Sequence, residues 1–289
     1  MHILIARNSS NAQANEADLI LGAYLQSQGI DYTSVDSLDQ TEVKASIYDM
    51  VVALGGDGTI LRTAHLVGEE EIPILGINYG HLGFLTNNET EGVVAAVAAA
   101  LAGETIKEER SNLRIDVLLE NEDEEAFDLS CNAAFDPSKG RSFFALNEAA
   151  ITRGSAGKII DFTIDISGSH VADMRGDGMV IATATGSTAY ALSAGGPLVA
   201  PGFNGLILVP LAPHTLVARA ILTDPIDIAE LKMGDNSATR EAELFIDGIR
   251  IDFPGPIRKV RIRRGSVPTI LLRFNRAPFY EHISETFFK

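Results

Sequence analysis

Short apolar runs alternate with longer segments of helical pattern in the first part of the chain. In one such segment Ala17, Leu21 and Tyr24 fall on one face of a helix, and Gly29 follows as a stop. The pattern predicts strands at 2–6, 31–35, 50–53 and 73–77, and helices at 12–28, 41–47, 60–67 and 91–101. Strands that alternate with helices are typical of a parallel sheet covered by helices.

The pattern changes near Lys107, after which apolar and polar residues alternate with a period of two. Segments 113–119 and 160–166 show this alternation, which is typical of half-buried strands. Segment 245–250 has a central Asp-Gly pair, a strong signal for a hairpin. The acidic segment 120–125 is interpreted as a solvated hairpin tip. This part of the chain is therefore predicted to be rich in β-structure.

Two domains and a returning tail follow from these patterns. Residues 1–108 are predicted to form an α/β domain with a Rossmann-like sheet, and residues 109–265 a β-rich, β-sandwich-like domain. The tail, residues 266–289, carries many apolar side chains. Because so much apolar surface must be buried, we expect the tail to dock back on the first domain.

Three glycines surround an aspartate between the predicted strand 50–53 and the predicted helix 60–67. The sequence is Leu54-Gly55-Gly56-Asp57-Gly58-Thr59. Without Cβ atoms the backbone amides can lie against a phosphate, and a helix N-terminus adds partial positive charge. Asp57 would repel that anion, so it is better suited to act as a base for a hydroxyl or to hold a metal ion. The alternative is a tight turn in which Asp57 or Thr59 caps the helix.

A second stretch, 175–197, predicts a loop, a strand, a hydroxyl-rich turn and a short helix. Ser187 can cap that helix and Gly195 can end it. Hydroxyls and free amides at a helix start suit a phosphate or a ribose, and Tyr190 could lay its ring on a heterocycle. The alternative is a capped surface helix with Tyr190 in the core.

The pair Asn147-Glu148 is a weaker signal, because it could bind ribose hydroxyls or adenine edges but is also a common polar strand end. Metal ligands are not obvious. The six histidines show no short zinc-like spacing, and Cys131 is the only cysteine.

The net charge of −16 over 289 residues argues against DNA, RNA or an anionic membrane as the main partner. It permits a small anionic ligand, which needs only a local positive site. No apolar stretch approaches the roughly 18 residues of a membrane span, and no basic leader is present. We therefore expect a cytoplasmic protein.

Taken together, four stretches resemble the motifs of bacterial NAD kinases (ATP-NAD kinases) in order and spacing. These stretches are Gly55 to Thr59, Asn78 to Phe84, Asn147-Glu148 and Asp177 to Pro197. The glycine element alone is shared with diacylglycerol and sphingosine kinases and, loosely, phosphofructokinases, whereas Thr188 to Pro197 is more particular to NAD kinases. The resemblance implies transfer of the γ-phosphoryl group of ATP to the 2′-hydroxyl of the adenosine ribose of NAD.

The resemblance also implies roles around the glycine loop. Asp57 would act as the catalytic base, Gly58 would cradle phosphate, and Arg62 would reach a phosphate charge. Phe84 would pack near the adenine. A divalent cation, Mg²⁺, would be held largely by the ATP phosphates and water rather than by protein ligands.

By the same resemblance, a larger set of residues would bind the dinucleotide. Asp177 would contact its nicotinamide half across a subunit boundary, which implies a homodimer or homotetramer. Lys158 stands where many relatives carry arginine, and Asp247 where some carry glutamine or histidine. The full set is Asn147, Glu148, Lys158, Arg175, Asp177, Thr185, Thr188, Ala189, Tyr190, Ser193, Ala212 and Asp247.

Two other functions use the same features. A lipid or other small-molecule kinase could share the glycine loop, but the acidic composition and the segment 188–197 favour a dinucleotide. A non-catalytic nucleotide-binding regulator could share the scaffold, but it would have little need of a base at Asp57.

Overall fold

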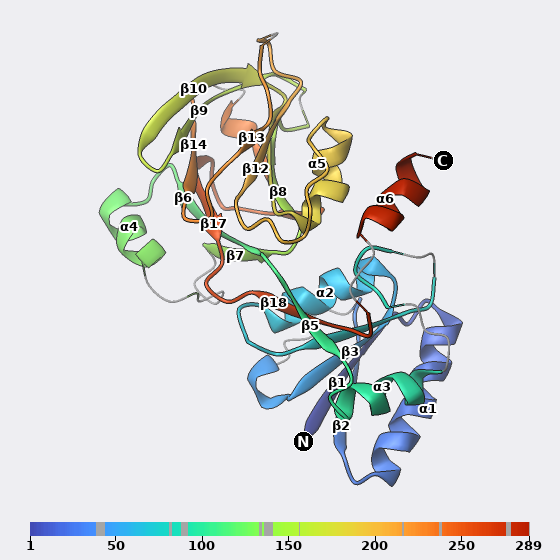
Figure 1. The fold of residues 1–289 in the computed structure, drawn as a ribbon. Helices are drawn as coiled ribbons and strands as arrows, with labels where there is room; N and C mark the ends of the chain where they lie inside the picture. Colours follow the sequence, from blue (N-terminus) through green and yellow to red (C-terminus); the bar gives the residue numbers. More distant parts are fainter. Residues whose placement is uncertain are drawn as a thin grey trace. The chain divides into compact units, whose positions relative to one another are not determined.

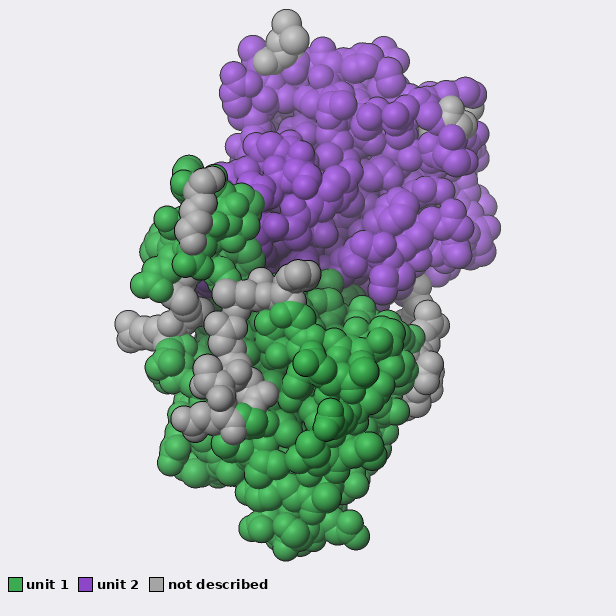
Figure 2. Space-filling model, turned by 90° about the vertical axis from the view of Figure 1, so that its right-hand side faces the viewer, with its two compact units in different colours: residues 1–110, 267–289 green, residues 111–266 purple. Residues whose placement is uncertain are grey.

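The computed structural model divides the chain into two compact units (Figure 2). Unit 1 comprises residues 1–110 and 267–289, and unit 2 comprises residues 111–266. The structure describes residues 1–38, 44–80, 83–87, 92–132, 135, 141–155, 157–215, 217–236, 239–275 and 279–288. Positions 41–43 and 91 of two expected helices, and positions 81–82 of the segment that ends at Phe84, lie outside the described residues.

Unit 1 is built on a six-stranded sheet with the strand order β2-β1-β3-β4-β18-β5 (Figure 1). The strands are β1 (His2–Arg7), β2 (Asp31–Asp36), β3 (Met50–Gly55), β4 (Ile74–Asn78), β5 (Ile106–Arg110) and β18 (Thr269–Arg273). Every neighbouring pair is parallel except β18 and β5, which are antiparallel. The predicted parallel sheet is therefore confirmed.

Helices cover both faces of this sheet. The helices of unit 1 are α1 (Ala12–Ser27), η1 (Ala45–Ile47), α2 (Asp57–Val67), α3 (Val93–Leu101) and α6 (Phe279–Phe287). Helices α1 and α3 share an apolar core with Leu75 and Ile77 of β4. Gly76 faces the other way, because a Cβ on it would lie 2.2 Å from Cδ1 of Ile60 in α2. Helices α1 and α3 therefore pack on one face of the sheet, and helix α2 packs on the other.

The C-terminal tail supplies an internal strand of this sheet. Leu271 of β18 pairs with Ile74 of β4 on one side and with Glu108 of β5 on the other. The expected return of the tail to the first domain is therefore confirmed. The sequence did not indicate that the returning segment would lie between two strands.

Unit 2 consists of two six-stranded antiparallel sheets around a shared apolar core. One sheet has the order β10-β9-β14-β17-β6-β7 and the other the order β13-β12-β11-β8-β15-β16. The first comprises β6 (Leu113–Leu119), β7 (Ser142–Ala145), β9 (Ile160–Ile166), β10 (Ser169–Gly176), β14 (Ile228–Met233) and β17 (Ile257–Arg264). The second comprises β8 (Glu148–Thr152), β11 (Gly178–Ala182), β12 (Ile207–Leu211), β13 (Ile221–Leu222), β15 (Glu243–Ile246) and β16 (Ile249–Ile251). This arrangement confirms the predicted β-rich, sandwich-like fold.

Helix α4 (Glu124–Asn132) corrects two expectations. The acidic segment 120–125 does not form a hairpin tip but leads into this helix, whose Glu124 pairs with Arg258 and Lys259 of β17. Strand β6 is not half-buried but buried at every position. Its polar face is covered because Arg114 bonds to Asp116 at 3.2 Å and to the carbonyl of Ser130 in α4 at 3.2 Å.

The Asp-Gly hairpin is confirmed. Ile246 of β15 pairs with Ile249 of β16, so the turn consists of Asp247 and Gly248 alone. Their φ angles of 47° and 81° are those of the hairpin turn that Asp-Gly favours. Unit 2 also contains η3 (Thr185–Thr188), α5 (Tyr190–Ser193) and η4 (Thr239–Glu241). Among the described residues no helix combines the length and apolar character needed to cross a membrane.

Candidate functional site

Asp57 opens helix α2 at the carboxyl end of β3. The helix begins three residues earlier than expected, with Gly56 as its N-cap, so neither Asp57 nor Thr59 serves as the cap. The Asp57 carboxylate instead accepts two backbone hydrogen bonds, from the amide of Phe84 to Oδ2 at 2.7 Å and from the amide of Leu85 to Oδ1 at 3.0 Å. Each oxygen keeps a further lone pair, and the side chain is half-buried, so it remains available to a hydroxyl.

Gly83 allows the main chain to approach this carboxylate. A Cβ on Gly83 would lie 2.0 Å from Oδ1 of Asp57 and 2.2 Å from its Cγ. Glycine is therefore required if residues 84 and 85 are to donate to Asp57. Sequence reasoning missed Gly83 as a site residue, although it belongs to the segment that carried the resemblance. No side-chain signal marks Gly83, because the groups that it admits to Asp57 are the backbone amides of Phe84 and Leu85.

The glycines of the 55–58 loop differ in what they do. A Cβ on Gly55 would lie 2.2 Å from Oγ1 of Thr59, so packing explains this glycine. Among the described residues, a Cβ on Gly56 would meet nothing within 4 Å, and one on Gly58 would meet only the Arg62 guanidinium at 3.6 Å. The described residues thus leave room beside Gly56 and Gly58 at the N-terminus of an eleven-residue helix, where a phosphate would be favoured.

Arg62 lies one helical turn beyond Gly58 and is half-buried. Its Nε is buried, and the described residues supply no hydrogen-bond partner for it. Burial lowers the pKa of Arg62, and the negative charge of Asp36 opposes that lowering. A buried guanidinium nitrogen without a partner is costly, and an anion at the helix N-terminus would reduce that cost.

In unit 2, Asp247 shapes the loop that carries Asn147 and Glu148. Its Oδ2 accepts from the amide of Leu146 at 2.8 Å, and its Oδ1 accepts from the amides of Asn147 at 2.8 Å and Glu148 at 3.0 Å. The resemblance implied that Asp247 contacts the dinucleotide. In this structure its oxygens bind main-chain amides, so Asp247 fixes the orientation of this loop.

Glu148 is buried, with 6% of its surface exposed. Burial, together with the nearby charge of Asp247, raises the pKa of Glu148 to about 8, although its carboxyl accepts a hydrogen bond from the backbone of Tyr190. Its Oε2 is buried and has no hydrogen-bond partner among the described residues. At neutral pH the carboxyl is therefore mostly protonated and can donate one hydrogen bond.

The hydroxyl-rich turn packs directly on this loop. Thr183 Oγ1 donates to the carbonyl of Leu146 at 2.7 Å. A Cβ on Gly186 would lie 2.2 Å from the carbonyl oxygen of Asn147, so glycine is required at this close approach. The structure thus brings together the Asn147-Glu148 pair, Thr185 and the start of α5.

Two details of the turn differ from expectation. Ser187 is fully buried and does not cap α5; its hydroxyl donates to the carbonyl of Ala184 at 2.7 Å and accepts from the amide of Val199 at 3.1 Å. Helix α5 has only four residues, which is too short for the expected anion site at a helix N-terminus.

Tyr190 is 43% exposed, which excludes the alternative that its ring lies in the core. Gly195, at φ 86°, follows the helix as expected.

A second group of predicted residues gathers around the end of β10. Arg175 Nε lies 2.6 Å from Asp161 Oδ1, and Asp177 Oδ1 lies 2.9 Å from Arg153 Nε. Lys158 and Arg175 line a cavity of about 460 Å³. Ala212, with φ 40°, is next to this group, because the amide of Asp177 donates to the carbonyl of Leu211. The structure therefore divides the predicted dinucleotide residues of unit 2 into two clusters.

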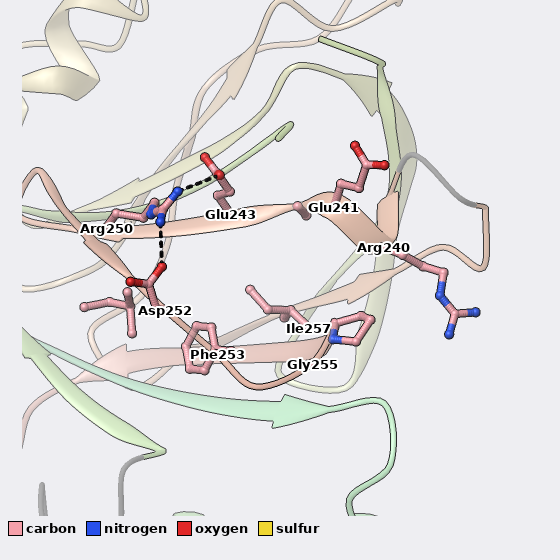
Figure 3. Close-up of a pocket in the computed structure, with 11 residues that line it drawn as sticks. Arg240, Glu241, Glu243, Arg250, Asp252, Phe253, Gly255 and Ile257 are labelled. Atoms are coloured by element: carbon pink, nitrogen blue, oxygen red, sulfur yellow. Dashed lines mark hydrogen bonds and ion pairs between the residues drawn. The ribbon is translucent and has the colours of Figure 1, made fainter. Parts of the chain in front are cut away.

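Another cavity, of about 280 Å³, lies beside the β15–β16 hairpin (Figure 3). Its lining includes Arg250, whose guanidinium pairs with Glu243 at 3.2 Å and with Asp252 at 2.8 Å. None of the predicted site residues lines it. Across the part of the chain that the structure describes, no group of three or more His, Cys, Asp or Glu side chains is arranged to hold a metal ion.

Two family models match the chain. Residues 7–105 match the ATP-NAD kinase N-terminal domain, and residues 146–273 match the ATP-NAD kinase C-terminal domain. The NAD kinase of Gemmatimonas aurantiaca is 34% identical over 236 residues, which cover 81% of this chain and 75% of that protein. The NAD kinase of Thermococcus kodakarensis is 38% identical over 231 residues, covering 79% of this chain and 74% of that protein.

Solved structures share the fold. An NAD kinase from Archaeoglobus fulgidus in complex with ATP superposes with a TM-score of 0.73 and 24% identity, covering 99% of this chain and 98% of that one. Yeast NADH kinase complexed with NADH gives a TM-score of 0.78 and 19% identity, covering 100% of this chain and 87% of that one.

Proposed function

This chain belongs to the ATP-NAD kinase family, and from that membership we propose how its own residues phosphorylate NAD. The reaction transfers the γ-phosphoryl group of ATP to the 2′-hydroxyl of the adenosine ribose of NAD and yields NADP and ADP. The observation that carries the proposal is the Asp57 carboxylate, held by two amides beside glycines that border open space.

Asp57 acts as the general base. A secondary hydroxyl is a poor nucleophile at pH 7, and a carboxylate about 3 Å away can accept its proton. The hydroxyl oxygen then forms a bond to the γ-phosphorus, the bond from that phosphorus to the β–γ bridging oxygen breaks, and ADP leaves. The two backbone amides fix both carboxylate oxygens, so the base is oriented before the substrate arrives.

The phosphates of ATP lie against Gly56 and Gly58 at the N-terminus of α2, where Arg62 adds a positive charge. Two observations on the described residues support this placement: none of them would contact a Cβ on Gly56, and none of them pairs with Nε of Arg62. The described residues offer no three-ligand cage, so Mg²⁺ would be held by the phosphates and water, with Asp57 the nearest carboxylate in the loop. When bound, the ion offsets the phosphoryl charge.

Residues of unit 2 bind the dinucleotide. The protonated Glu148 donates to an oxygen of the adenosine ribose, and the exposed ring of Tyr190 packs on a heterocycle. Asp247 contributes indirectly, by holding the amides of Leu146 to Glu148. The backbone and hydroxyls of Thr185, Thr188, Ala189 and Ser193 complete this part of the site.

Asp177 contacts the nicotinamide half of the dinucleotide. The other residues of the second cluster, Arg175, Lys158 and Ala212, flank this part of the site. Because Asp177 makes this contact across a subunit boundary, the enzyme is a homodimer or homotetramer. It acts in the cytoplasm. Light scattering of the purified protein tests the assembly, since a monomeric mass would contradict it.

The purified protein is incubated with ATP, Mg²⁺ and NAD, and NADP is assayed. The proposal predicts NADP that accumulates in step with ADP. Two parallel reactions replace NAD with diacylglycerol or sphingosine in detergent. Phosphorylation of a lipid without NADP formation would favour a lipid kinase, and NAD binding without any ADP formation would favour a non-catalytic regulator.

A further inference from the structure

Arg273, at the end of β18, binds three consecutive carbonyls of the segment that holds Asp57. Its Nη2 donates to the carbonyl of Phe84 at 2.8 Å, and its Nη1 donates to those of Leu85 at 2.7 Å and Thr86 at 2.9 Å. Its Nε donates to Oε2 of Glu108 at 2.6 Å. The side chain is 3% exposed, so every nitrogen of this buried guanidinium has a partner.

The connection from Arg273 to Asp57 passes through one peptide group. The carbonyl of Phe84 and the amide N–H of Leu85 belong to the same peptide bond, which is planar. Arg273 binds that carbonyl, and the amide donates to Oδ1 of Asp57 at 3.0 Å. Fixing one end of the plane therefore fixes the other. Hydrogen bonds in such a chain also polarise one another, which strengthens the bond to the carboxylate.

Strand pairing explains why Arg273 is held so firmly. Glu108 of β5 pairs with Leu271 of β18, and Arg110 pairs with Thr269. Because side chains alternate along a strand, Glu108, Arg110 and Arg273 project from the same face of the sheet. Glu108 lies between the two guanidinium groups, 2.6 Å from Arg273 and 2.8 Å from Arg110.

The cluster of Glu108, Arg110 and Arg273 carries a net positive charge. Burial alone would raise the pKa of Glu108, but the charges of Arg110 and Arg273 hold it below its ordinary value, so the cluster contains two cations and one anion. Burial lowers the pKa of Arg110, and the charges of Glu108 and Asp57 oppose that lowering. The charge of Asp57 thus acts on Arg110 in the same direction as that of Glu108.

We propose that Arg273 is a positioning residue for phosphoryl transfer: it locks residues 84–86 so that their amides hold the carboxylate of Asp57 toward the substrate hydroxyl. The inference rests on the proposed role of Asp57 as the base. Lysine cannot replace Arg273, because an ammonium group is a point charge that cannot span three carbonyls and Glu108 at once.

The test compares Arg273→Lys with Arg114→Lys. Arg114 is a matched control, since it is a buried arginine that bonds to Asp116 and to the carbonyl of Ser130. We expect Arg273→Lys to lower kcat by at least about tenfold with KM for NAD changed less than about threefold, because it misplaces the base without touching the dinucleotide. Hydrogen exchange of the amides of Phe84 and Leu85 should become faster in this variant. Arg114→Lys should leave kcat and both amides unchanged.

A double-mutant cycle with Asp57→Asn decides whether Arg273 acts through Asp57. The inference predicts that Arg273→Lys lowers kcat no further once Asp57→Asn has removed the base. If the two losses multiply instead, or if Arg273→Lys alone keeps its kcat and its amide protection, the inference is overturned while the role of Asp57 stands. If Asp57→Asn alone keeps full turnover, the proposed function of Asp57 fails, and the inference fails with it.

A second variant covers the case in which Arg273→Lys does not fold. Glu108→Gln keeps the size and shape of the side chain but removes the negative charge that holds Nε of Arg273. Like Arg273→Lys, it should lower kcat and reduce the protection of the Leu85 amide from hydrogen exchange, but by less. Unchanged kcat and protection in Glu108→Gln would contradict the inference.

Discussion

At the scale of single residues, the site depends on how closely the main chain approaches the Asp57 carboxylate. The peptide at Gly83 comes so near that a Cβ would lie 2.0 Å from Oδ1. The two amides that follow then donate to both oxygens of the carboxylate. Glycine is therefore required at position 83, outside the 55–58 loop, just as it is required at position 55 within it.

Gly83→Ala should lower kcat by about a hundredfold, since the added methyl group must displace the carboxylate or the amides that hold it. Gly202→Ala is the matched control, because a Cβ on Gly202 meets nothing within 4 Å. Steady-state kinetics at saturating NAD and ATP measure the effect. Equal kcat values for the two variants would show that the close approach of Gly83 has no role in turnover.

Glu148 gives the enzyme a stability that depends on pH. Its pKa is raised from 4.5 to about 8 in the folded protein. The contribution of the protonated carboxyl to the free energy of unfolding is therefore fully present below pH 4.5 and is lost as the pH rises through 8. Glu148→Gln removes this loss. We expect the variant to gain on the order of 4 kcal/mol in free energy of unfolding over the wild type at pH 8.5, and almost nothing at pH 4.5.

Urea unfolding at pH 4.5 and pH 8.5 measures this difference. Glu125→Gln, at an exposed position, serves as the control and should show the same small effect at both values. A Glu148→Gln variant that follows the wild type at both pH values would contradict the buried, protonated carboxyl.

At the scale of elements, the sequence predicted strands such as β1, β3 and β9 and helices such as α1, because their apolar spacing reflects burial directly. It could not predict that α2 begins at Asp57, since the residues of that first turn are also those of a glycine loop. Nor could it assign the buried polar face of β6, because alternation at 113–119 shows where polar residues are and not what covers them. The cover, α4, lies in a segment whose acidic composition resembles a loop.

The candidate site shows the same division. Local spacing indicated the glycine loop and the turn that carries Tyr190, whereas Asn147-Glu148 gave only a weak signal. The amides of Phe84 and Leu85 carry no side-chain signal, and Arg273 is separated from Asp57 by more than two hundred positions, so only the sheet brings them together. The Asp247-Gly248 pair indicated a turn. That Asp247 also binds three backbone amides depends on the fold and could not be predicted from the pair.

Helix α4 should stabilise unit 2 mainly through Phe127. This ring is 6% exposed and packs with Leu118 and Cys131, and the Arg261 guanidinium lies 5.0 Å from its centroid. Phe127→Ala should therefore lower the free energy of unfolding by about 3 kcal/mol. Leu129→Ala in the same helix, at a position 74% exposed, should change it by less than about 0.5 kcal/mol.

Denaturant unfolding of both variants measures the difference, and kcat should stay at the wild-type value in each, since α4 contains no proposed site residue. Similar unfolding midpoints for Phe127→Ala and Leu129→Ala would show that α4 does not depend on this contact.

At the scale of the whole molecule, unit 1 is completed only by the last part of the chain. Unit 2 is inserted between β5 and β18, which are neighbours in the sheet of unit 1. The strand that closes this sheet also carries Arg273, which holds the segment beside Asp57. The tail is therefore linked to both the integrity of unit 1 and the orientation of its base.

In the proposed reaction, Asp57 removes the proton from the 2′-hydroxyl of NAD. Asp57→Asn is compared with Asp49→Asn, which alters an exposed carboxylate of the same unit. The dissociation constant for NAD and kcat for NADP formation are measured for both. We expect Asp57→Asn to bind NAD as the wild type does and to lose at least about a hundredfold in kcat, while Asp49→Asn keeps both values. Wild-type turnover in Asp57→Asn would contradict this role of the carboxylate.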